Sequence, residues 1–356
     1  MNLEDSLSKL LSSIKDKVQG LTATEMGLKP EITLKDNEIK IKLSAGFPTK
    51  PLEQSLLPLL AASMQNAFPK HRIQISFECF INAHRTQLIG KGLRGVKNTI
   101  AVASGKGGVG KSTVAVNLAT ALARAGAKVG LLDADIYGPS IPLMLGDTAG
   151  VQISNDRYLP VSAHGIQAMS IGYLTDSNEA LIWRGPMLAK SLLQMLDITL
   201  WDELDYLFID LPPGTGDIQL SLVQKIPLTS AIVVTTPQNV ATLDAQKAIR
   251  MFEKTNIDLL GVVENMSLHV CSQCGHQEAI FGTGGGQKLS ESFQVNLLGQ
   301  LPLDSQIRSQ SDEGKPTAVH HDKLAASFMN TAMRAAIELS KKPLNYMGKF
   351  PDIVVE

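Results

Sequence analysis

The sequence predicts an α/β protein in which a doubly wound, mostly parallel sheet follows a small α+β unit. The larger, C-terminal part contains short segments that are almost wholly apolar, which is typical of strands buried on both faces of a parallel sheet. Helical patterns separate these segments, and this alternation indicates the doubly wound class. The N-terminal part instead alternates helix and strand patterns in short pieces.

The small α+β unit is expected to occupy residues 1–90. Apolar residues recur there at helical spacing near the start, and two stretches of period-two alternation flank a polar turn. Proline at position 51 favours a helix start, because its fixed φ suits the first turn. The expected elements are a helix over 3–18, a hairpin of strands 32–34 and 39–43, a helix over 51–67 and a third strand over 73–79.

The larger unit is expected to span residues 98–342, after a glycine-rich and basic linker at 91–97 and before a tail at 343–356. A late helix over 323–339 has one apolar face, which predicts packing. The expected strands are 99–103, 129–133, 206–210, 231–235 and 259–263. Ligands of such sheets bind beyond the carboxyl ends of the strands, so the loops that follow these strands are the places to look for function.

Composition excludes several classes of partner. The net charge of −1 gives no electrostatic reason to expect nucleic acid or an anionic membrane. No apolar run reaches the length of a membrane helix, and the N-terminus does not resemble a secretory signal or transit peptide. The three cysteines, Cys79, Cys271 and Cys274, are too few and odd in number for a disulfide framework. We therefore expect a cytoplasmic protein. Cys79 alternates with apolar residues of the third strand, which predicts packing there.

A phosphate-binding loop is predicted directly after the strand at 99–103. Residues 105–113 read Gly-Lys-Gly-Gly-Val-Gly-Lys-Ser-Thr and fit G-x-x-x-x-G-K-[ST] between a strand and a helix. Glycines let the main-chain amides approach phosphates, and the helix start adds a positive field. Lys111 is expected at the β- and γ-phosphates of ATP, and Ser112 at Mg²⁺. The expected nucleotide-binding residues are Gly105, Lys106, Gly107, Gly108, Val109, Gly110, Lys111, Ser112 and Thr113.

Aspartates that follow two other strands complete the expected ATPase site. Asp210 ends an apolar strand, as a carboxylate that holds Mg²⁺ through water should. The glycines of 211–217 suit a loop that responds to the γ-phosphate. Asp133 and Asp135 follow another strand, and one of them should face the nucleotide. Asp135, further into the loop, is better placed to orient the attacking water, while a turn or capping role is the alternative for Asp133.

Lys106 is not required by the general pattern, and a solvated surface charge is its ordinary interpretation. The run 106–113, however, resembles the deviant Walker A ATPases, which include septum-positioning, chromosome-partitioning, arsenite-pump and nitrogenase-reductase proteins. The resemblance implies that Lys106 crosses a two-fold dimer interface and places a positive charge at the partner's transferring phosphate. Hydrolysis would then depend on dimerisation.

A second candidate site is the pair Cys271 and Cys274, which is flanked by His269 and His276. Two thiolates at this spacing can hold one metal centre, but they supply half a tetrahedral set. A symmetric dimer could combine two pairs around a [4Fe–4S] cluster. A zinc ion held with both histidines, a dithiol redox couple and an inert pair are the alternatives. Spacing alone ranks zinc above iron–sulfur.

The motifs together resemble the Mrp/ApbC family of iron–sulfur cluster carrier ATPases over residues 98–316. The resemblance is carried by the segments 105–113, 133–140, 183–187, 210–217 and 264–267. It implies that Cys271 and Cys274 bind a bridging cluster and that Asn265 contacts adenine. It also implies that the N-terminal unit is similar to cluster-assembly accessory proteins. The family commonly has a proline after the first cysteine, where this chain has Ser272.

We therefore expect a homodimeric ATPase that carries a [4Fe–4S] cluster. Scaffold or donor proteins would supply the cluster and apo iron–sulfur proteins would receive it. The alternatives are a spatial-organiser ATPase that acts on a membrane or DNA, and a zinc-stabilised regulatory ATPase. The neutral net charge and the cysteine pair argue against the spatial organiser.

Overall fold

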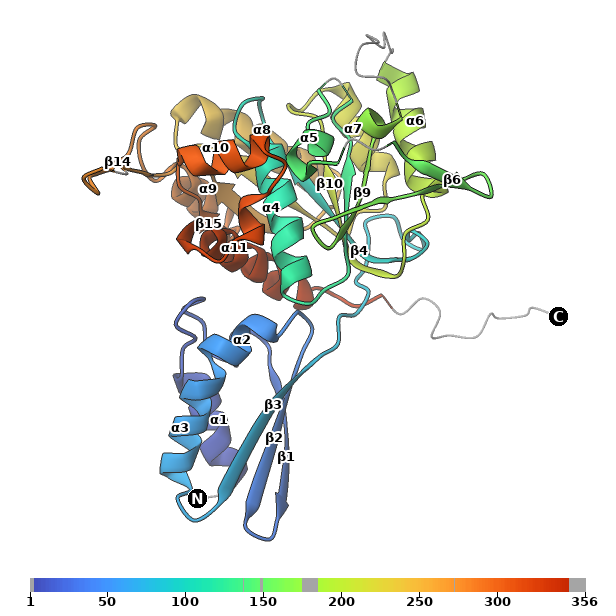
Figure 1. Cartoon of the computed structure of the whole chain (residues 1–356). Coiled ribbons are helices and arrows are strands. Elements are labelled where there is room, and N and C mark those ends of the chain that lie inside the picture. Colours follow the sequence, from blue (N-terminus) through green and yellow to red (C-terminus); the bar gives the residue numbers. More distant parts are fainter. Residues whose placement is uncertain (1–2, 137, 148–149, 175–184, 272, 346–356) are drawn as a thin grey trace, which may run out of the picture. The chain divides into compact units, whose positions relative to one another are not determined.

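The computed structural model describes residues 3–136, 138–147, 150–174, 185–271 and 273–345. The chain forms two compact units (Figure 1). One comprises Met1–Asn82 with Ala336–Lys341, and the other comprises Ala83–Ala335 with Lys342–Glu356. The segment expected as a linker, 91–97, belongs to the second unit, and its last two residues begin a strand of that unit's sheet.

The smaller unit packs helices on a three-stranded sheet of order β1-β2-β3. Its elements are α1 (Leu3–Ser13), β1 (Lys29–Lys35), β2 (Glu38–Ala45), α2 (Lys50–Ser55), α3 (Leu57–Ala67) and β3 (Arg72–Cys79). The predicted hairpin is confirmed, because β1 and β2 pair antiparallel. The single helix expected over 51–67 is wrong: it is divided at Leu56, since Pro58 has no N–H to continue the α2 hydrogen bonds.

Cys79 does not pack in the core as the sequence predicted. It is the last residue of β3, which is an edge strand, and it is exposed. The other apolar side chains of its face, those of Ile73, Ile75 and Phe77, are only half-buried. Alternation alone identified the face correctly but could not show that this strand lies at the edge of the sheet.

The larger unit contains an eight-stranded sheet of order β15-β12-β11-β4-β10-β5-β9-β8, in which every adjacent pair is parallel except β9 and β8. This confirms the predicted α/β class. Its strands are β4 (Val96–Ala103), β5 (Val129–Asp133), β8 (Val161–Ala163), β9 (Ile166–Ser170), β10 (Leu204–Asp210), β11 (Ser230–Thr235), β12 (Leu259–Glu264) and β15 (Leu297–Gln300). All five predicted strands are present; β8, β9 and β15 were not predicted. A short hairpin of β6 (Gln152–Ser154) and β7 (Arg157–Leu159) lies outside this sheet.

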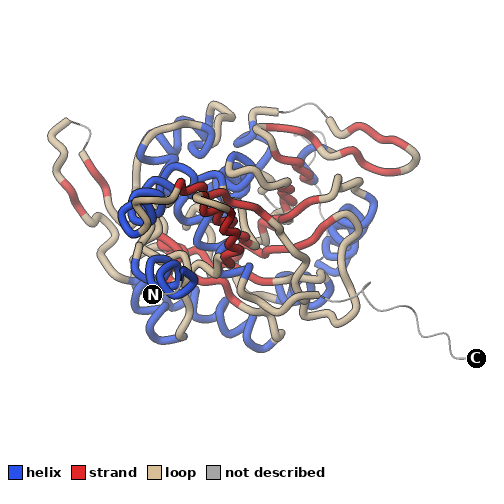
Figure 2. Tube along the Cα trace, turned by 90° about the horizontal axis from the view of Figure 1, so that it is seen from below, coloured by secondary structure: helices blue, strands red, loops and turns tan. Residues whose placement is uncertain are grey.

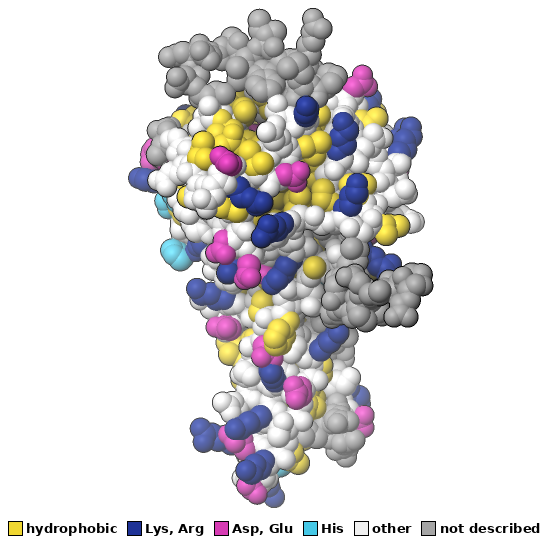
Figure 3. All heavy atoms as spheres, turned by 90° about the vertical axis from the view of Figure 1, so that its right-hand side faces the viewer, with side chains coloured by type: hydrophobic (Ala, Val, Ile, Leu, Met, Phe, Trp, Pro, Cys, Tyr) yellow, Lys and Arg dark blue, Asp and Glu magenta, His cyan; other side chains and the backbone are white. Residues whose placement is uncertain are grey.

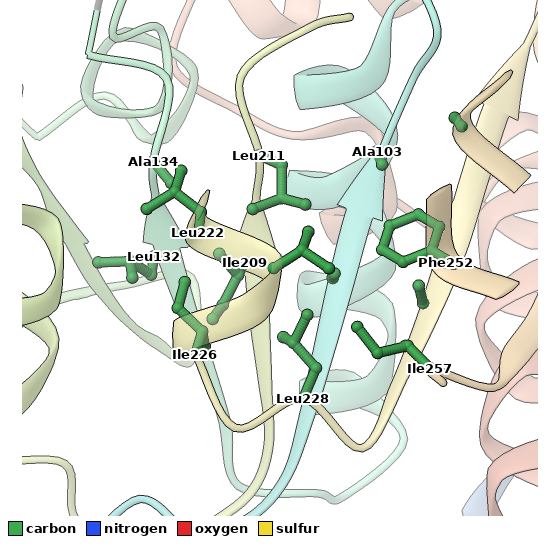
Figure 4. Close-up of a cluster of buried hydrophobic side chains, with 14 of the residues drawn as sticks. Ala103, Leu132, Ala134, Ile209, Leu211, Leu222, Ile226, Leu228, Phe252 and Ile257 are labelled. Atoms are coloured by element: carbon green, nitrogen blue, oxygen red, sulfur yellow. The ribbon is translucent and has the colours of Figure 1, made fainter. Parts of the chain in front are cut away.

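Helices cover both faces of this sheet (Figure 2). The helices are α4 (Lys111–Arg124), α5 (Ile141–Leu145), α6 (Gly185–Ile198), α7 (Asp217–Lys225), α8 (Asn239–Lys254), α9 (Gly285–Phe293), α10 (Ser305–Asp312) and α11 (Lys323–Ser340). One core cluster joins the sheet to α6, α7, α8 and α9, with Leu222, Phe252 and Ile209 among its fully buried members (Figure 4). None of the helices in the described ranges is long and apolar enough to cross a membrane.

Parallel pairing brings the carboxyl ends of the central strands to one edge of the sheet. Strands β4, β5, β10, β11 and β12 all end there, and the loops that follow them hold the predicted site residues. A doubly wound sheet therefore concentrates the polar side chains of distant segments at this edge.

Candidate functional site

The phosphate loop, residues 105–113, connects the carboxyl end of β4 to the start of α4. Gly108 and Gly110 have φ of 84° and 81°, in the left-handed region that glycine adopts without strain. The Ser104 hydroxyl donates to the Lys106 carbonyl at 2.9 Å and fixes the first turn of the loop. Helix α4 begins at Lys111, so its first N–H groups point into the loop, as an anion site requires.

Two glycines of this loop are needed for packing and two leave open space. A Cβ at Gly105 would overlap the backbone of Asp244 in α8, and one at Gly110 would overlap the side-chain amide of Asn265. A Cβ at Gly107 or Gly108 would meet no neighbouring atom within 4 Å. The free side of the loop is thus the side where the main-chain amides can approach a phosphate group.

Lys111 and Asp210 form a buried ion pair at the centre of the site. The Lys111 Nζ lies 2.6 Å from Asp210 Oδ1 and 3.4 Å from the Ser112 hydroxyl. Their side chains are 5% and 0% exposed, so water does not screen the pair. The second carboxylate oxygen, Asp210 Oδ2, is buried and has no hydrogen-bond partner among the described residues. A buried acceptor of this kind beside a hydroxyl fits a hydrated Mg²⁺ ion.

Asp133 is fully buried beside this ion pair. Its oxygens accept hydrogen bonds from the N–H groups of Asp135 and Ile141, at 3.1 and 3.3 Å, and from the Ser170 hydroxyl at 3.0 Å. Burial and the charge of Asp210 raise the pKa of Asp133, Lys111 and the hydrogen bonds from Ser170 and Asp135 lower it, and the net result is a pKa of about 7. Asp133 therefore holds the backbone at Asp135 and at Ile141 in place. Asp135 lies in that loop and is half-buried, and its role at the attacking water stays a prediction.

Asn265 follows β12 and is tied to the phosphate loop. Its side-chain N–H donates to the Val109 carbonyl at 2.9 Å, and its backbone N–H donates to Thr235 at 2.8 Å. The side chain thus lies at the loop that is expected to bind ATP. Its predicted contact with adenine stays a prediction.

The loop after Asp210 also touches the base of the phosphate loop. The Gly214 N–H donates to the Ser104 carbonyl at 2.9 Å, and Gln219 of α7 donates to the Pro213 carbonyl. A displacement at the phosphate loop can therefore reach α7. Lys106 itself is half-buried and takes part in no ion pair within the described ranges, so its role in trans stays a prediction.

Two residues of the site, Ser170 and Glu264, were given no role by sequence reasoning. Ser170 ends β9, whose apolar run is interrupted by Gln167, and its hydroxyl donates to Asp133. Glu264, the last residue of β12, is buried and accepts from the Gly286 N–H at 2.6 Å and the Gln300 side chain at 2.7 Å. A charged residue that ends an apolar strand was the available signal for Glu264.

The cysteine pair lies in the turn of a hairpin formed by β13 (His269–Val270) and β14 (Gln277–Glu278). This hairpin projects from the larger unit in both ribbon views (Figures 1 and 2). The Cys271 N–H donates to the His276 carbonyl and the Gly275 N–H donates to the Cys271 carbonyl, each at 2.9 Å. Gly275 has a φ of 71°, which the turn requires.

The turn also places hydrogen-bond donors around the Cys271 sulfur. The backbone N–H groups of Cys274 and Gln273 donate to this sulfur, the Cys274 side chain adds a further hydrogen bond, and together they hold the pKa of the Cys271 thiol below its usual range. Cys271 is half-buried and Cys274 is exposed, so both are accessible. Thiolate is the form that ligates metals, and these amide donors favour it.

Among the described residues, the side chains considered for a zinc site from the spacing are not gathered into one. The His269 Nδ1 is bonded to the Leu303 carbonyl at 3.0 Å. Over the described ranges, no group of three or more histidine, cysteine, aspartate and glutamate side chains is placed to hold a metal ion. The hairpin of one chain therefore offers a pair of sulfur ligands only. Ser272 of the turn, and Trp183 and Arg184 of the motif at 183–187, lie outside the described residues.

Known proteins with similar sequences identify the family of this chain. The model of the ParA-group family described as NUBPL iron-transfer P-loop NTPase matches residues 95–337. An iron–sulfur cluster carrier protein of Haemophilus influenzae is 57% identical over 251 residues, which are 69% of this chain and 68% of the relative. A protein of the same name from Deinococcus radiodurans is 43% identical over 335 residues, 93% of this chain and 94% of the relative.

A solved structure of a nucleotide-binding protein has a fold similar to that of this chain. The nucleotide-binding protein of Archaeoglobus fulgidus, solved in complex with ADP, is 39% identical, with a TM-score of 0.58 over 64% of this chain and 90% of that one. The family predicted from the motifs is thus confirmed by matches that cover most of the chain. The chain belongs to the iron-transfer P-loop NTPases, the family of the iron–sulfur cluster carrier proteins.

Proposed function

We propose that the protein is an ATP-dependent iron–sulfur cluster carrier, a homodimer that binds a [4Fe–4S] cluster through Cys271 and Cys274 of both copies. The single observation that carries the proposal is the number and placement of the sulfur ligands that this cysteine pair offers. The β13–β14 turn places two accessible cysteines three positions apart, yet the described residues of one chain supply only half of the four ligands that such a cluster needs. The proposal also includes hydrolysis of Mg·ATP at the phosphate loop.

Hydrolysis is assigned to residues gathered around the phosphate loop. Lys111 would exchange Asp210 for the β- and γ-phosphate oxygens, while Asp210 and Ser112 would hold the magnesium ion and its water. Asp135 would orient a water molecule, whose oxygen attacks the γ-phosphorus as the bond to the ADP oxygen breaks. Lys106 of the second copy would neutralise the charge on the transferring group.

Exposed apolar side chains support a second copy at the carboxyl edge of the sheet. Leu143, Leu220, Val240 and Leu243 are 59%, 36%, 65% and 57% exposed, and they lie near the starts of the helices α5, α7 and α8. These helices leave the edge that holds the phosphate loop. Contact of this edge with its symmetric equivalent would bury apolar area and bring Lys106 toward the other nucleotide.

Cluster transfer would proceed by ligand exchange, in which thiolates of an apo iron–sulfur protein replace Cys271 and Cys274 without a change of oxidation state. Scaffold or donor proteins would load the carrier by the same exchange in reverse. A nucleic acid or membrane partner is not part of the proposal. Lysine and arginine side chains are interspersed with acidic ones on the face drawn in Figure 3, and the net charge is −1. We place this chemistry in the cytoplasm, where thiols stay reduced.

Anaerobic reconstitution with iron and sulfide tests the cluster site. The wild-type protein should take up about four iron atoms per dimer and show the absorbance of a [4Fe–4S] cluster. Cys271→Ser should lose the cluster and keep its heat of binding Mg·ATP, while Cys79→Ser, a matched control on the other unit, should keep both. Full cluster uptake by Cys271→Ser would contradict the proposal, as would protein that holds stoichiometric zinc and takes up no cluster.

A further inference from the structure

We propose that the coupling segment, residues 265–271, is a rigid link that transmits the nucleotide state of the phosphate loop to the cysteine pair. The inference rests on the proposed function and adds the route by which ATP changes the cluster site. Only six peptide units separate Asn265 from Cys271, a span of at most roughly 20 Å. Both ends, and most residues between them, are held by hydrogen bonds.

The first end of the segment moves with the phosphate loop. Asn265 donates to the Val109 carbonyl at 2.9 Å, and its side chain is almost fully buried. Gly110, the residue after Val109, leaves no room for a Cβ because the Asn265 amide occupies that space. When the amides of 105–113 reorient toward a triphosphate, the Val109 carbonyl and Asn265 must therefore shift together.

The middle of the coupling segment is hydrogen-bonded to a neighbouring stretch of the chain, residues 301–303. Ser267 donates to the Leu301 carbonyl through both its backbone N–H, at 2.9 Å, and its hydroxyl, at 3.0 Å. Leu303 donates to the Leu268 carbonyl at 2.9 Å, and the His269 ring is bonded to the Leu303 carbonyl at 3.0 Å. This pairing prevents the segment from absorbing a displacement as a loose loop would.

One residue turns the chain between the two ends. Met266 has a φ of 56°, a left-handed conformation that costs a non-glycine residue about 1 kcal/mol. Its side chain reaches toward Gly110, next to the Asn265 amide. The surrounding contacts hold this strained turn, so a shift of the phosphate loop changes the direction in which the segment leaves it.

The second end of the segment is the cysteine turn itself. Strand β13 starts at His269, and the Cys271 N–H is bonded to the His276 carbonyl at 2.9 Å. The backbone from His269 to Cys271 is therefore paired with the other strand of the hairpin, up to the residue that carries the sulfur ligand. A displacement at Asn265 reaches the amide donors that surround the Cys271 sulfur, and through them the geometry in which two hairpins share a cluster.

Thiol alkylation of the cluster-free full-length protein tests the link without relying on a loaded carrier. Iodoacetamide labelling of Cys271, followed by peptide mass spectrometry, is measured with and without Mg²⁺ and a non-hydrolysable ATP analogue. Exposed Cys79 serves as the internal reference. A coupling energy in the usual range predicts a change in the Cys271 rate of about fivefold or more, with the Cys79 rate unchanged.

Two variants weaken the link at positions outside the nucleotide site. Ser267→Ala with His269→Ala removes two bonds to the 301–303 stretch, and insertion of two glycines after Leu268 lengthens the segment. Both should bind the analogue with wild-type affinity and show less than about a twofold effect on Cys271 labelling. The control, Ser290→Ala with His164→Ala, removes a hydroxyl-to-carbonyl bond and the contacts of one ring nitrogen with two carbonyl groups elsewhere in the same unit.

The outcomes separate this inference from the proposed function. If calorimetry shows binding of the analogue but Cys271 labelling does not respond in the wild-type protein, the link is refuted while the carrier function stands. A full nucleotide effect in both weakened variants refutes it equally, as does an effect lost in the control. Absence of any heat with Mg²⁺ and the analogue contradicts the ATPase proposal, and the inference falls with it.

Discussion

The buried carboxyl of Asp133 makes the stability of the nucleotide-free protein depend on pH. Burial raises its pKa in the folded state to about 7, from 3.8. The folded protein therefore keeps a proton that the unfolded chain has already released between these two values. The bound proton of Asp133 contributes to the free energy of unfolding in full below pH 3.8, and this contribution is lost as pH rises through about 7. At about 1.4 kcal/mol per pH unit, the loss between pH 5 and 8 amounts to about 3 kcal/mol.

Urea unfolding of the nucleotide-free protein at pH 5, 6, 7 and 8 measures this contribution. Trp201 is buried in the larger unit, so its fluorescence follows the unit that contains Asp133. Asp133→Asn removes the titrating proton and should shrink the loss of unfolding free energy between pH 5 and 8 by about 3 kcal/mol. The variant is expected to be less stable at every pH, because an amide cannot accept all three hydrogen bonds.

The comparison therefore uses the change with pH and not the absolute stability. Asp202→Asn, at an exposed aspartate of the same unit, should follow the wild-type pH profile. Parallel profiles for the wild-type protein and Asp133→Asn would show that Asp133 ionises in the folded state as readily as in the unfolded chain, and this would refute the reasoning.

Three further predictions concern the site and its support. Lys111→Ala should abolish the heat of Mg·ATP binding, and measurable ATP binding would contradict this expectation. The variant should also lower the unfolding free energy by about 3–5 kcal/mol, because Asp210 is left buried without its partner. Lys106→Ala should keep the wild-type affinity for ATP and suppress turnover at least about 1,000-fold in a phosphate-release assay, whereas unchanged turnover would rule out its role in trans. Gln87→Leu should destabilise the larger unit by about 2–4 kcal/mol, since Gln87 bonds to Val223, Ile226 and Leu228 with its side chain; a loss under about 0.5 kcal/mol in urea unfolding would contradict this.

The sequence predicted the features of the fold that depend on local pattern. Each of the five predicted strands of the central sheet contains a run of apolar residues, and the glycine-rich run after β4 could be interpreted from chain order alone. Local pattern failed where the outcome depended on distant parts of the chain. The alternation at Cys79 did not show that β3 lies at a sheet edge, and the three-residue strand β8 offered too short a pattern.

The candidate site divides in the same way. Lys111, Ser112 and Asp210 were identified because each stands at a fixed position after a strand. The contact of Asn265 with Val109 joins residues 156 positions apart, and no periodicity indicates it. Two of the glycines were explained incompletely from the sequence, since Gly105 and Gly110 are also required by neighbours in α8 and at Asn265. Pairings between loops of different strands become visible only once the sheet order is known.

The buried charges explain why nucleotide and metal should bind together. In the nucleotide-free protein, Lys111 lies 2.6 Å from Asp210 and also offsets the field that Asp210 exerts on Asp133. A triphosphate that draws the Lys111 ammonium away leaves one carboxylate, and a second acid beside it, in an environment that does not solvate charge. ATP alone therefore raises the energy of the site as it binds, whereas a divalent cation beside Asp210 restores the balance. If the proposed function holds, we therefore expect the ion pair to disfavour the ATP-bound positions of Lys111 and Asp210 until both ligands are present.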